Sequence, residues 1–508
     1  MSDQLTPVLG YRRLVSADER TAPSFLLESV EGGASVGRFS ILGAQPSVEV
    51  VAHERRVTVR DHERGTTEEI ERENPLTYVR SLTAGLEAAP VNALGGAPGM
   101  QLPAFTGGWV GYAGYDTVRY LEPEKLPFSA APHDDRGLPD LHFGLYRQVV
   151  VFDHVAKVLQ AIHFVLMHEG ETDPDAAYER GAAELNELTR RLETHSVPLA
   201  AGAVDIDTTG RSSAELVGNF DRPAFENAVM RTKEHIAAGD AFQVVISQRF
   251  ERRTNADPFD IYRALRIVNP SPYMIYLQAE GSILVASSPE ILCRVEDGAV
   301  TNRPLAGTRK RGRTDAEDLE LERDLRSDAK ETAEHVMLVD LGRNDLGRVC
   351  QLGSISLDSI LDVERYSHVM HLSSTVRGQL RSGLDAWDAL RHTLPVGTVS
   401  GAPKVRAMQI IDDLEPTRRG PYAGGIGYVS LSGQMDMAIA LRTMVVPVNP
   451  GDAGADGWTV HLQAGAGIVA DSVPASEYDE TVNKAAGLNR AIDLAEHAFA
   501  RGEAADGS

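Results

Sequence analysis

The stretch 239-GDAFQVVISQRF-250 predicts the end of a helix followed by a β-strand. Side chains in a strand alternate between two faces. One face here carries Phe242, Val244 and Ile246, and the other carries Gln243, Val245, Ser247 and Arg249. Gln243 lies on the half-polar face, which meets either water or a ligand.

The same pattern extends over much of the chain. Strands are expected at 241–250, 273–278, 283–287, 424–431, 435–446 and 458–464, and strand meanders at 46–72 and 147–166. Helices are expected from residue 174 onward and near 223–238, 315–342, 402–413 and 475–500. Antiparallel strands in runs, with helices grouped outside them, indicate the α+β class rather than a parallel doubly wound sheet.

A break in periodicity divides the chain. Residues 197-VPLAAGAVDIDTTGRSSAELVGN-219 show neither helical nor strand spacing and predict a linker. We therefore expect an N-terminal lobe over 1–196, a linker over 197–219 and a catalytic lobe over 220–496. Residues 497–508, which end in RGEAADGS, predict a disordered tail.

Composition limits the partners. The 508 residues carry a net charge of −23, which disfavours nucleic acid and anionic membranes. The chain shows no apolar run long enough for a membrane span and no signal-peptide plan, so a cytoplasmic protein is expected. Its two cysteines, Cys293 and Cys350, form no disulfide or metal-binding pattern.

Two pairs of acidic residues have helical spacing. Glu331 and Glu334 lie three residues apart, and so do Glu477 and Glu480. Residues at that spacing share one helix face, where like charges repel unless a cation lies between them. Four carboxylates from two helices would suit Mg²⁺, which prefers oxygen ligands. Two ordinary solvated acidic faces would show the same spacing, which is common in a chain with 73 acidic residues.

Other candidate residues are individually unspecific. Gly465 and Gly467 can present backbone N–H groups to an anion or can simply form a tight turn. Arg442 stands in an apolar strand and requires an anionic partner if buried. Glu290 follows a turn in apolar surroundings that would raise its pKa and suit a general acid. His371 alternates with apolar neighbours and is catalytic or structural.

Several motifs together resemble one family. They are RPLAGTRKRG, AEHVMLVDLGRNDLGRV, VMHLSSTVRG, PVGTVSGAPKVRAMQIID, PYAGGIGYVS, LQAGAGIVADS and EYDETVNKA, with LLESV, GRFSILG and GGWVGYAGYD in the N-terminal half. In this order they resemble the chorismate-utilising enzymes, most closely the large synthase subunits of anthranilate synthase. The resemblance spans nearly the whole chain. It implies a two-lobed antiparallel β-sandwich core with helices packed outside.

The resemblance also implies residue roles. Mg²⁺ would be held by Glu334 and Glu480, with Glu331 and Glu477 beside them. The substrate-binding residues would be Arg442, Tyr422, Gly465 and Gly467 at one carboxylate, and Gly307 and Thr308 along the ring. Thr398, also along the ring, and Lys484, near the metal-bound end, would be catalytic residues together with Gln243. Glu290 would be the general acid for loss of the C4 hydroxyl, and His371 would handle a proton or orient the ring during pyruvate elimination.

Partners are implied as well. The substrates would be chorismate and ammonia. No glutaminase motif occurs in the chain, so a separate glutamine amidotransferase subunit in a hetero-oligomer, or free ammonia, is expected. Residues that match a tryptophan feedback site are Glu28, Ser29, Arg38, Pro272, Tyr273 and Met274. They could instead join the two lobes.

Three alternatives stay open beside an anthranilate synthase. Aminodeoxychorismate synthases usually carry a nucleophilic lysine where this chain has Ala306, which disfavours that activity. Salicylate and isochorismate synthases carry a lysine, as base for water, where this chain has Gln243. A neutral amide cannot accept that proton. An inactive regulatory or scaffold relative would be expected to lack Glu334, Glu480 or His371, and all three are present.

Overall fold

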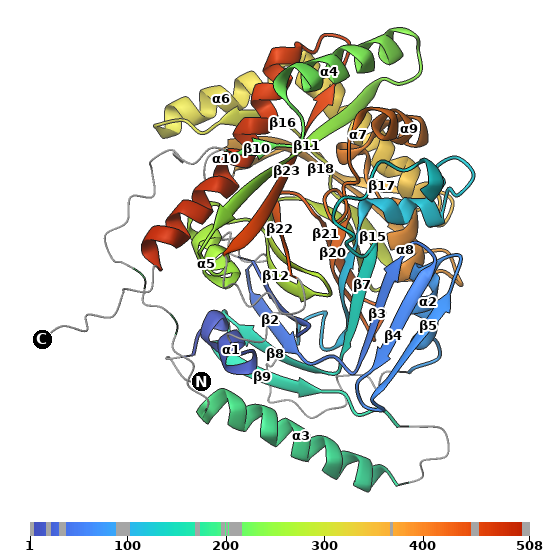
Figure 1. Cartoon of the computed structure of the whole chain (residues 1–508), viewed down its shortest axis with the longest axis vertical. Coiled ribbons are helices and arrows are strands. Elements are labelled where there is room, and N and C mark those ends of the chain that lie inside the picture. Colours follow the sequence, from blue (N-terminus) through green and yellow to red (C-terminus); the bar gives the residue numbers. More distant parts are fainter. Residues whose placement is uncertain are drawn as a thin grey trace, which may run out of the picture.

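The computed structural model describes residues 5–16, 22–29, 37–87, 102–167, 173–194, 199, 202, 216–365, 369–448 and 457–499. Two large antiparallel sheets dominate these residues (Figure 1). Within the same ranges, no helix combines the length and the apolar composition that a membrane crossing requires.

The first sheet has eleven strands among the described residues. Their order is β10 (Val217–Gly218), β11 (Gln243–Thr254), β23 (Trp458–Ile468), β22 (Thr443–Pro447), β13 (Ser282–Ser288), β12 (Tyr273–Ala279), β1 (Ser24–Glu28), β2 (Phe39–Ala44), β8 (Gln148–Asp153) and β9 (Val158–His163), and β19 (Gly401–Ala402) also pairs with β11. The longest pairing joins β11 to β23, where Val245 lies opposite Gly467.

The second sheet has twelve strands in the described part of the chain. Their order is β16 (Leu305–Lys310), β18 (Val369–Gln379), β15 (Ala299–Asn302), β14 (Ile291–Glu296), β21 (Met435–Ile439), β20 (Gly425–Ser430), β6 (Gly108–Ala113), β7 (Leu141–Tyr146), β3 (Val48–His53), β4 (Arg56–Asp61) and β5 (Thr66–Glu71), and β17 (Ser356–Arg365) also pairs with β18.

The two sheets pack face to face. One buried apolar cluster joins Phe25 and Ile275 of the first sheet to Tyr112 and Ile426 of the second. The Phe25 ring also meets the ring of Tyr146 edge-on, with centroids 4.8 Å apart. Interdigitated apolar faces of this kind are the core of a β-sandwich, so the predicted α+β sandwich is confirmed.

Helices cover both outer faces (Figure 1). One group packs on the first sheet: α1 (Pro7–Leu14), α3 (Pro174–Thr194), α5 (Pro258–Val268) and α10 (Pro474–Ala498). Another group packs on the second sheet: α2 (Pro75–Leu82), α7 (Ala329–Gly347) and α8 (Ala386–Thr393). Two more helices lie against first-sheet strands: α9 (Lys404–Leu414) contacts β11 and β19, and α4 (Arg222–Ala237) contacts β11, β23 and α10. Leu325 of α6 (Asp315–Ser327) packs on β18.

Each half of the chain contributes strands to both sheets. In the first sheet β1 pairs with β12, and in the second β6 pairs with β20. Most of the predicted linker lies outside the described residues, but Val217–Gly218 forms β10 against β11. The predicted tail likewise lies outside the described residues from residue 500 on, whereas α10 continues to Ala498.

Two sequence-based predictions of secondary structure were wrong. The helix expected over 315–342 is two helices, because Asp328 turns out of the helix and its side chain caps the backbone N–H groups of Lys330 and Glu331. The strand expected over 435–446 is interrupted at Arg442, whose φ of 46° is left-handed. Arg442 is also half-buried rather than enclosed in a strand interior.

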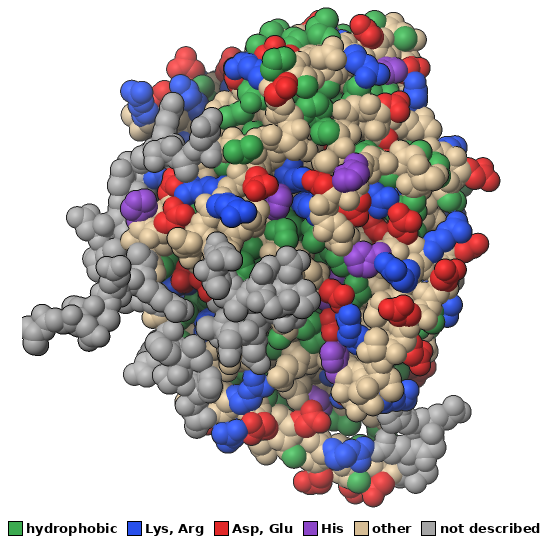
Figure 2. Space-filling view, viewed as in Figure 1, with side chains coloured by type: hydrophobic (Ala, Val, Ile, Leu, Met, Phe, Trp, Pro, Cys, Tyr) green, Lys and Arg blue, Asp and Glu red, His purple; other side chains and the backbone are tan. Residues whose placement is uncertain are grey.

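Both charge signs are interspersed over the molecular surface seen in Figure 2, and no continuous basic patch appears on that face. This distribution agrees with the acidic composition of the chain. The features that distinguish the molecule lie instead where α7 and α10 approach the ends of β11, β16 and β23.

Candidate active site

The two predicted acidic pairs lie at one place. Glu331 and Glu334 are on α7, and Glu477 and Glu480 are on α10. Burial raises the pKa of Glu334, and the charges of Glu331 and Glu480 raise it further. Burial also raises the pKa of Glu477, again with a contribution from Glu480. Glu334 on α7 and Glu480 on α10 therefore repel each other across the two helices.

Each of these carboxylates has its own donor. Gln243 Nε2 donates to Glu334 Oε1 over 3.1 Å, and Lys484 Nζ lies 2.7 Å from Glu480 Oε1. Arg309 Nη1 lies 3.4 Å from Glu331 Oε1, and the Ser472 hydroxyl stabilises the charged form of Glu477.

Within the described ranges no three acidic, histidine or cysteine side chains converge closely enough to form a ready-made metal cage. The donor chemistry nevertheless fits a divalent cation. Four carboxylates supply only oxygen ligands, which Mg²⁺ prefers. Burial is the larger cause of the raised pKa of Glu334, and the charges of Glu331 and Glu480 add to it. A bound cation would offset that repulsion.

Gln243 faces this acidic cluster. It is 3% exposed, so the face of β11 that was expected to be half-polar is buried. A Cβ added to Gly467 on the adjacent strand would lie 2.6 Å from Gln243 Nε2. The missing side chain at position 467 therefore makes room for the amide, which the register of β11 and β23 places beside it.

His371 on β18 contacts β16. Its Nδ1 lies 3.2 Å from the carbonyl oxygen of Gly307 and 3.0 Å from Thr308 Oγ1. The carbonyl accepts a hydrogen bond from Nδ1–H, so the neutral ring presents Nε2 as its acceptor. Burial lowers the pKa of His371 to about 4, and the charges of Arg442 and Lys484 act in the same direction. His371 is therefore neutral at physiological pH.

Position 307 requires a glycine, because of both its backbone conformation and the little room beside it. Its φ is 72°, in the left-handed region, and a Cβ would lie 3.2 Å from Glu331 Oε2. The residue thus forms a bulge in the pairing of β16 with β18 and brings the strand against the acidic cluster.

Glu290 lies between β13 and β14, with only 6% of its surface exposed. Burial raises its pKa to about 8, although the Thr398 hydroxyl and the backbone at Leu305 favour the charged form. The predicted rise is confirmed. A carboxyl group with this pKa carries its proton at neutral pH and can donate it.

The remaining substrate-binding candidates gather at the end of β23. Lys484 Nζ donates to the carbonyl oxygen of Gly465 over 2.9 Å, and a Cβ at Gly465 would lie 3.0 Å from the Tyr422 hydroxyl. Arg442 contacts Asn269 Oδ1 at 3.4 Å. Its charge acts on His371, which brings the arginine into the same network.

The sequence did not single out a buried ion pair behind these residues. Arg419 and Glu415 are 2.6 Å apart at their closest atoms, and Arg419 also donates to the carbonyl oxygens of Val399 and Val245. Glu415 accepts from Ser247. The pair fixes the Thr398 loop to β11. Its only sequence signal is an acid and a base four residues apart, which is also common on protein surfaces.

The candidate tryptophan residues divide into two groups. Glu28 and Met274 lie opposite each other in the pairing of β1 with β12, next to Ser29, whose hydroxyl is buried without a hydrogen-bond partner in the described structure. Pro272 precedes β12 directly. Tyr273 instead donates to Asp436 on β21, and Arg38 bonds Asp153 on β8.

Glu28 is already engaged within the chain. It accepts a hydrogen bond from the Tyr262 hydroxyl over 2.6 Å and lies 3.0 Å from Arg266 Nε. These contacts join the first sheet to α5. Among the described residues, the buried hydroxyl of Ser29 beside them has no hydrogen-bond partner.

Comparisons with known proteins place these features in context. Residues 23–490 match the family model described as chorismate binding enzyme. The anthranilate synthase alpha subunit 1, chloroplastic, of Oryza sativa subsp. japonica is 56% identical over 98% of this chain and 87% of its own length. The anthranilate synthase component 1 of Pseudomonas aeruginosa is 46% identical over 98% of this chain and 94% of its own length.

Solved structures agree. The anthranilate synthase component I of Streptococcus pneumoniae TIGR4 superposes with a TM-score of 0.73 at 35% identity, over 96% of this chain and 98% of that one. The menaquinone-specific isochorismate synthase of Escherichia coli, at 20% identity and a TM-score of 0.66 over 96% and 92% of the two chains, shares the fold.

Proposed function

The chain belongs to the chorismate-binding enzyme family, and we propose that it is the synthase subunit of an anthranilate synthase, which converts chorismate and ammonia into anthranilate and pyruvate. Ammonia would add at C2 of chorismate as the C4 hydroxyl leaves as water. Loss of the C2 proton and of the enolpyruvyl group, released as pyruvate, would then leave the aromatic ring.

Two titratable groups suit these proton transfers. Glu290, with a pKa of about 8, holds the proton that the departing C4 hydroxyl needs. His371, with a pKa of about 4, is neutral and can accept the C2 proton at Nε2. Groups with pKa values displaced in opposite directions divide acid and base roles in this way.

Substrate carboxylates would bind at the two ends of the site. Arg442, Tyr422 and the backbone of Gly465 and Gly467 offer donors at one end, and Lys484 offers a donor beside the acidic cluster. Mg²⁺ held by Glu334 and Glu480, with Glu331 and Glu477 beside them, would neutralise and anchor a carboxylate. Correct positioning of the ring is then the main contribution of the site.

The observation that carries the choice of nucleophile is the buried amide of Gln243 beside Glu334. A neutral amide cannot deprotonate water, which argues against salicylate and isochorismate synthesis. Ammonia arrives as a competent nucleophile and needs no base at this position. Ala306, in β16, offers no nucleophile of the kind aminodeoxychorismate synthases use.

A product assay tests this proposal. The chain with chorismate, Mg²⁺ and ammonium salt at mildly alkaline pH is expected to form anthranilate, measured by fluorescence and chromatography. Glutamine in place of ammonium is expected to give no product until a separate glutamine amidotransferase subunit is added, because the chain has no glutaminase motif. Salicylate, isochorismate or aminodeoxychorismate as the main product would refute it.

We also propose feedback inhibition by tryptophan at the seam of β1 and β12. The partnerless hydroxyl of Ser29, beside Glu28 and Met274, supports a ligand there. Tryptophan is expected to raise the KM for chorismate, and Ser29→Ala to weaken this effect. Ser47→Ala, which removes a hydroxyl bonded to the Leu145 carbonyl elsewhere, is the matched control. Unchanged kinetics at millimolar tryptophan would leave a purely structural role.

Composition supports a cytoplasmic location for this chain, as a hetero-oligomer with its amidotransferase. The rice relative is named as a chloroplastic protein, so fractionation of the source cells is the measurement that decides the compartment.

A further inference from the structure

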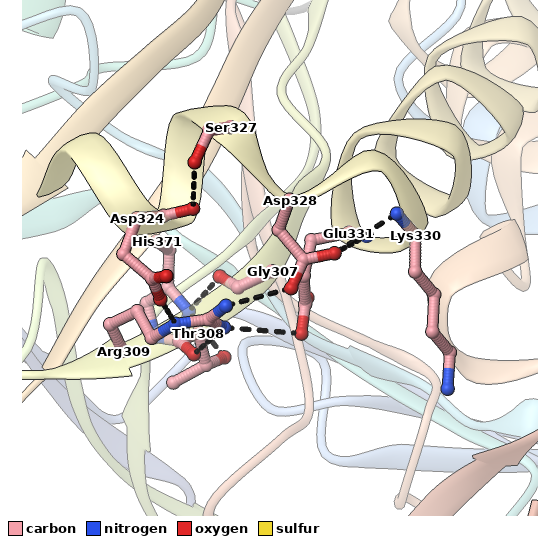
Figure 3. Close-up of polar contacts among 9 residues, drawn as sticks. All are labelled: Gly307, Thr308, Arg309, Asp324, Ser327, Asp328, Lys330, Glu331 and His371. Atoms are coloured by element: carbon pink, nitrogen blue, oxygen red, sulfur yellow. Dashed lines mark hydrogen bonds and ion pairs between the residues drawn. The ribbon is translucent and has the colours of Figure 1, made fainter. Parts of the chain in front are cut away.

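Arg309 connects three carboxylates at the junction of α6 and α7 (Figure 3). Its Nε donates to Asp324 Oδ2 over 2.6 Å, and its Nη2 donates to Asp328 Oδ2 over 2.8 Å. Its Nη1 reaches Glu331 Oε1 over 3.4 Å. The planar guanidinium allows this because its donors point in several fixed directions.

The three bonds are unequal. The two shorter ones have the length of charge-assisted hydrogen bonds. The bond to Glu331 is longer than an ordinary N–H···O bond. Glu331 can therefore change partner while Arg309 stays anchored to Asp324 and Asp328.

The anchor of Arg309 is itself well held. Asp328 Oδ1 accepts the backbone N–H groups of Lys330 and Glu331 over 3.0 and 3.2 Å, which leaves its other oxygen for the arginine. Arg309 also donates to the carbonyl oxygen of Thr308 over 3.0 Å. The arginine thus links β16, beside His371, to the first turn of α7.

We propose that Arg309 is a fixed internal counter-ion that competes with the divalent cation for Glu331, and thereby sets the affinity of the cation site. This inference rests on the proposed magnesium site. A guanidinium and a dication repel each other, so a carboxylate drawn toward the ion loses part of its attraction to Arg309. Because β16 stays anchored, the exchange leaves Gly307 and Thr308 in place.

A purely structural Arg309 predicts the opposite sign. If the arginine only held α6, α7 and Glu331 in position, its removal would loosen Glu331 and weaken cation binding. Competition predicts tighter binding. The direction of the change in affinity therefore separates the two roles.

The test is a titration of the full-length chain with Mn²⁺, followed through the electron paramagnetic resonance signal of the free ion. Arg309→Gln is expected to bind Mn²⁺ about fivefold more tightly than the unmodified chain, since a nearby competing charge is removed. The matched control is Arg311→Gln. Arg311 follows Arg309 by two residues and bonds Asp318 of α6, so the variant removes the same charge from a neighbouring site. Its dissociation constant is expected to change by less than about twofold, because that charge is more screened.

A double-mutant cycle assigns the effect to Glu331. In a Glu331→Gln background, the effect of Arg309→Gln is expected to fall below about twofold, since the contested carboxylate is absent. A new ion site at Asp324 and Asp328 would instead leave the effect intact. If Arg309→Gln does not fold, Asp324→Asn gives a second test at an exposed carboxylate. The substitution releases Arg309 toward Glu331, so it should weaken Mn²⁺ binding when Glu331 is present and have no such effect when Glu331 is replaced.

Three results would overturn the inference: equal or weaker Mn²⁺ binding by Arg309→Gln, an equal shift in Arg311→Gln, or a shift that persists without Glu331. If the unmodified chain binds Mn²⁺ and any of these three results is found, the proposed role of Arg309 is rejected and the proposed magnesium site stands. If the unmodified chain binds no Mn²⁺, the magnesium site fails and the inference fails with it.

Discussion

Replacing Glu290 with glutamine should affect both catalysis and the pH dependence of stability. The substitution keeps the shape of the side chain and removes its titration. Glu290 is 6% exposed and has a pKa of about 8, raised by burial. The same carboxyl group in an unfolded chain has the ordinary value of 4.5.

The sign of the stability effect follows from where the proton is bound. Below pH 4.5 both the folded and the unfolded chain hold it. Between pH 4.5 and 8 the unfolded chain releases the proton while the folded chain retains it, so rising pH favours unfolding. At about 1.4 kcal/mol for each tenfold difference in proton affinity, the loss has a ceiling of about 5 kcal/mol, complete above pH 8.

Two measurements follow this change. The free energy of unfolding of the unmodified chain, from urea denaturation, should fall between pH 4.5 and 8, and Glu290→Gln should flatten that fall. At pH 7 the variant should lose about 10²- to 10⁴-fold in kcat, the usual contribution of a general acid. The unmodified enzyme should lose kcat above pH 8 as Glu290 ionises.

The argument is refuted if Glu290→Gln retains kcat within a factor of ten at pH 7. It is equally refuted if the variant and the unmodified chain lose stability in parallel between pH 4.5 and 8. The first result would remove the general-acid role, and the second would show that another group carries the pH dependence.

Three further outcomes can be checked. Arg419→Lys should lower kcat/KM for chorismate about 10- to 100-fold, because lysine cannot make the bidentate bond to Glu415 and reach both carbonyl oxygens. Arg119→Lys, at an equally buried ion pair with Asp116, is the control for lost stability and should keep activity near normal. Gly467→Ala should lower kcat with little loss of melting temperature, since its methyl group would lie 2.6 Å from the Gln243 amide; full activity would show that this amide has no role. Removing divalent cations with a chelator should abolish anthranilate formation and added Mg²⁺ should restore it, whereas activity that survives the chelator would exclude the cation site.

Many helices and strands could be predicted because their residue spacing is a local property of the sequence. Alternation predicted the strands around 241–250 and 458–464 and drew attention to Gln243. The quoted motifs include His371, whereas Glu290 was predicted from its turn in apolar surroundings. The break at Asp328 was missed because acidic residues fit both a helix face and a helix cap, and only the three-dimensional arrangement decides between them. The left-handed φ of Arg442 has no local signal in a run of apolar residues.

Long-range pairing was harder to predict. The periodicity of β1 shows that it is a strand but does not show that its partner is β12, far along the chain. The same limitation hid the role of Arg419, whose carbonyl partners at Val399 and Val245 belong to two other elements. Contacts of this kind depend on which segments meet, and sequence spacing alone does not contain that information.

The sharing of both sheets by the two halves of the chain also has a consequence for biosynthesis. When β6 leaves the ribosome, its partner β20 is still untranslated, and β1 likewise waits for β12. At ~5–20 residues per second, the interval between Ala113 and Gly425 lasts roughly 15–60 s. During it the edge of β6 that later pairs with β20 is exposed, although its other edge can already pair with β7. An exposed edge of this kind is prone to aggregation. We therefore expect the edge of β6 to stay exposed until β20 is made, and a gene divided at the predicted linker to yield fragments that expose such edges.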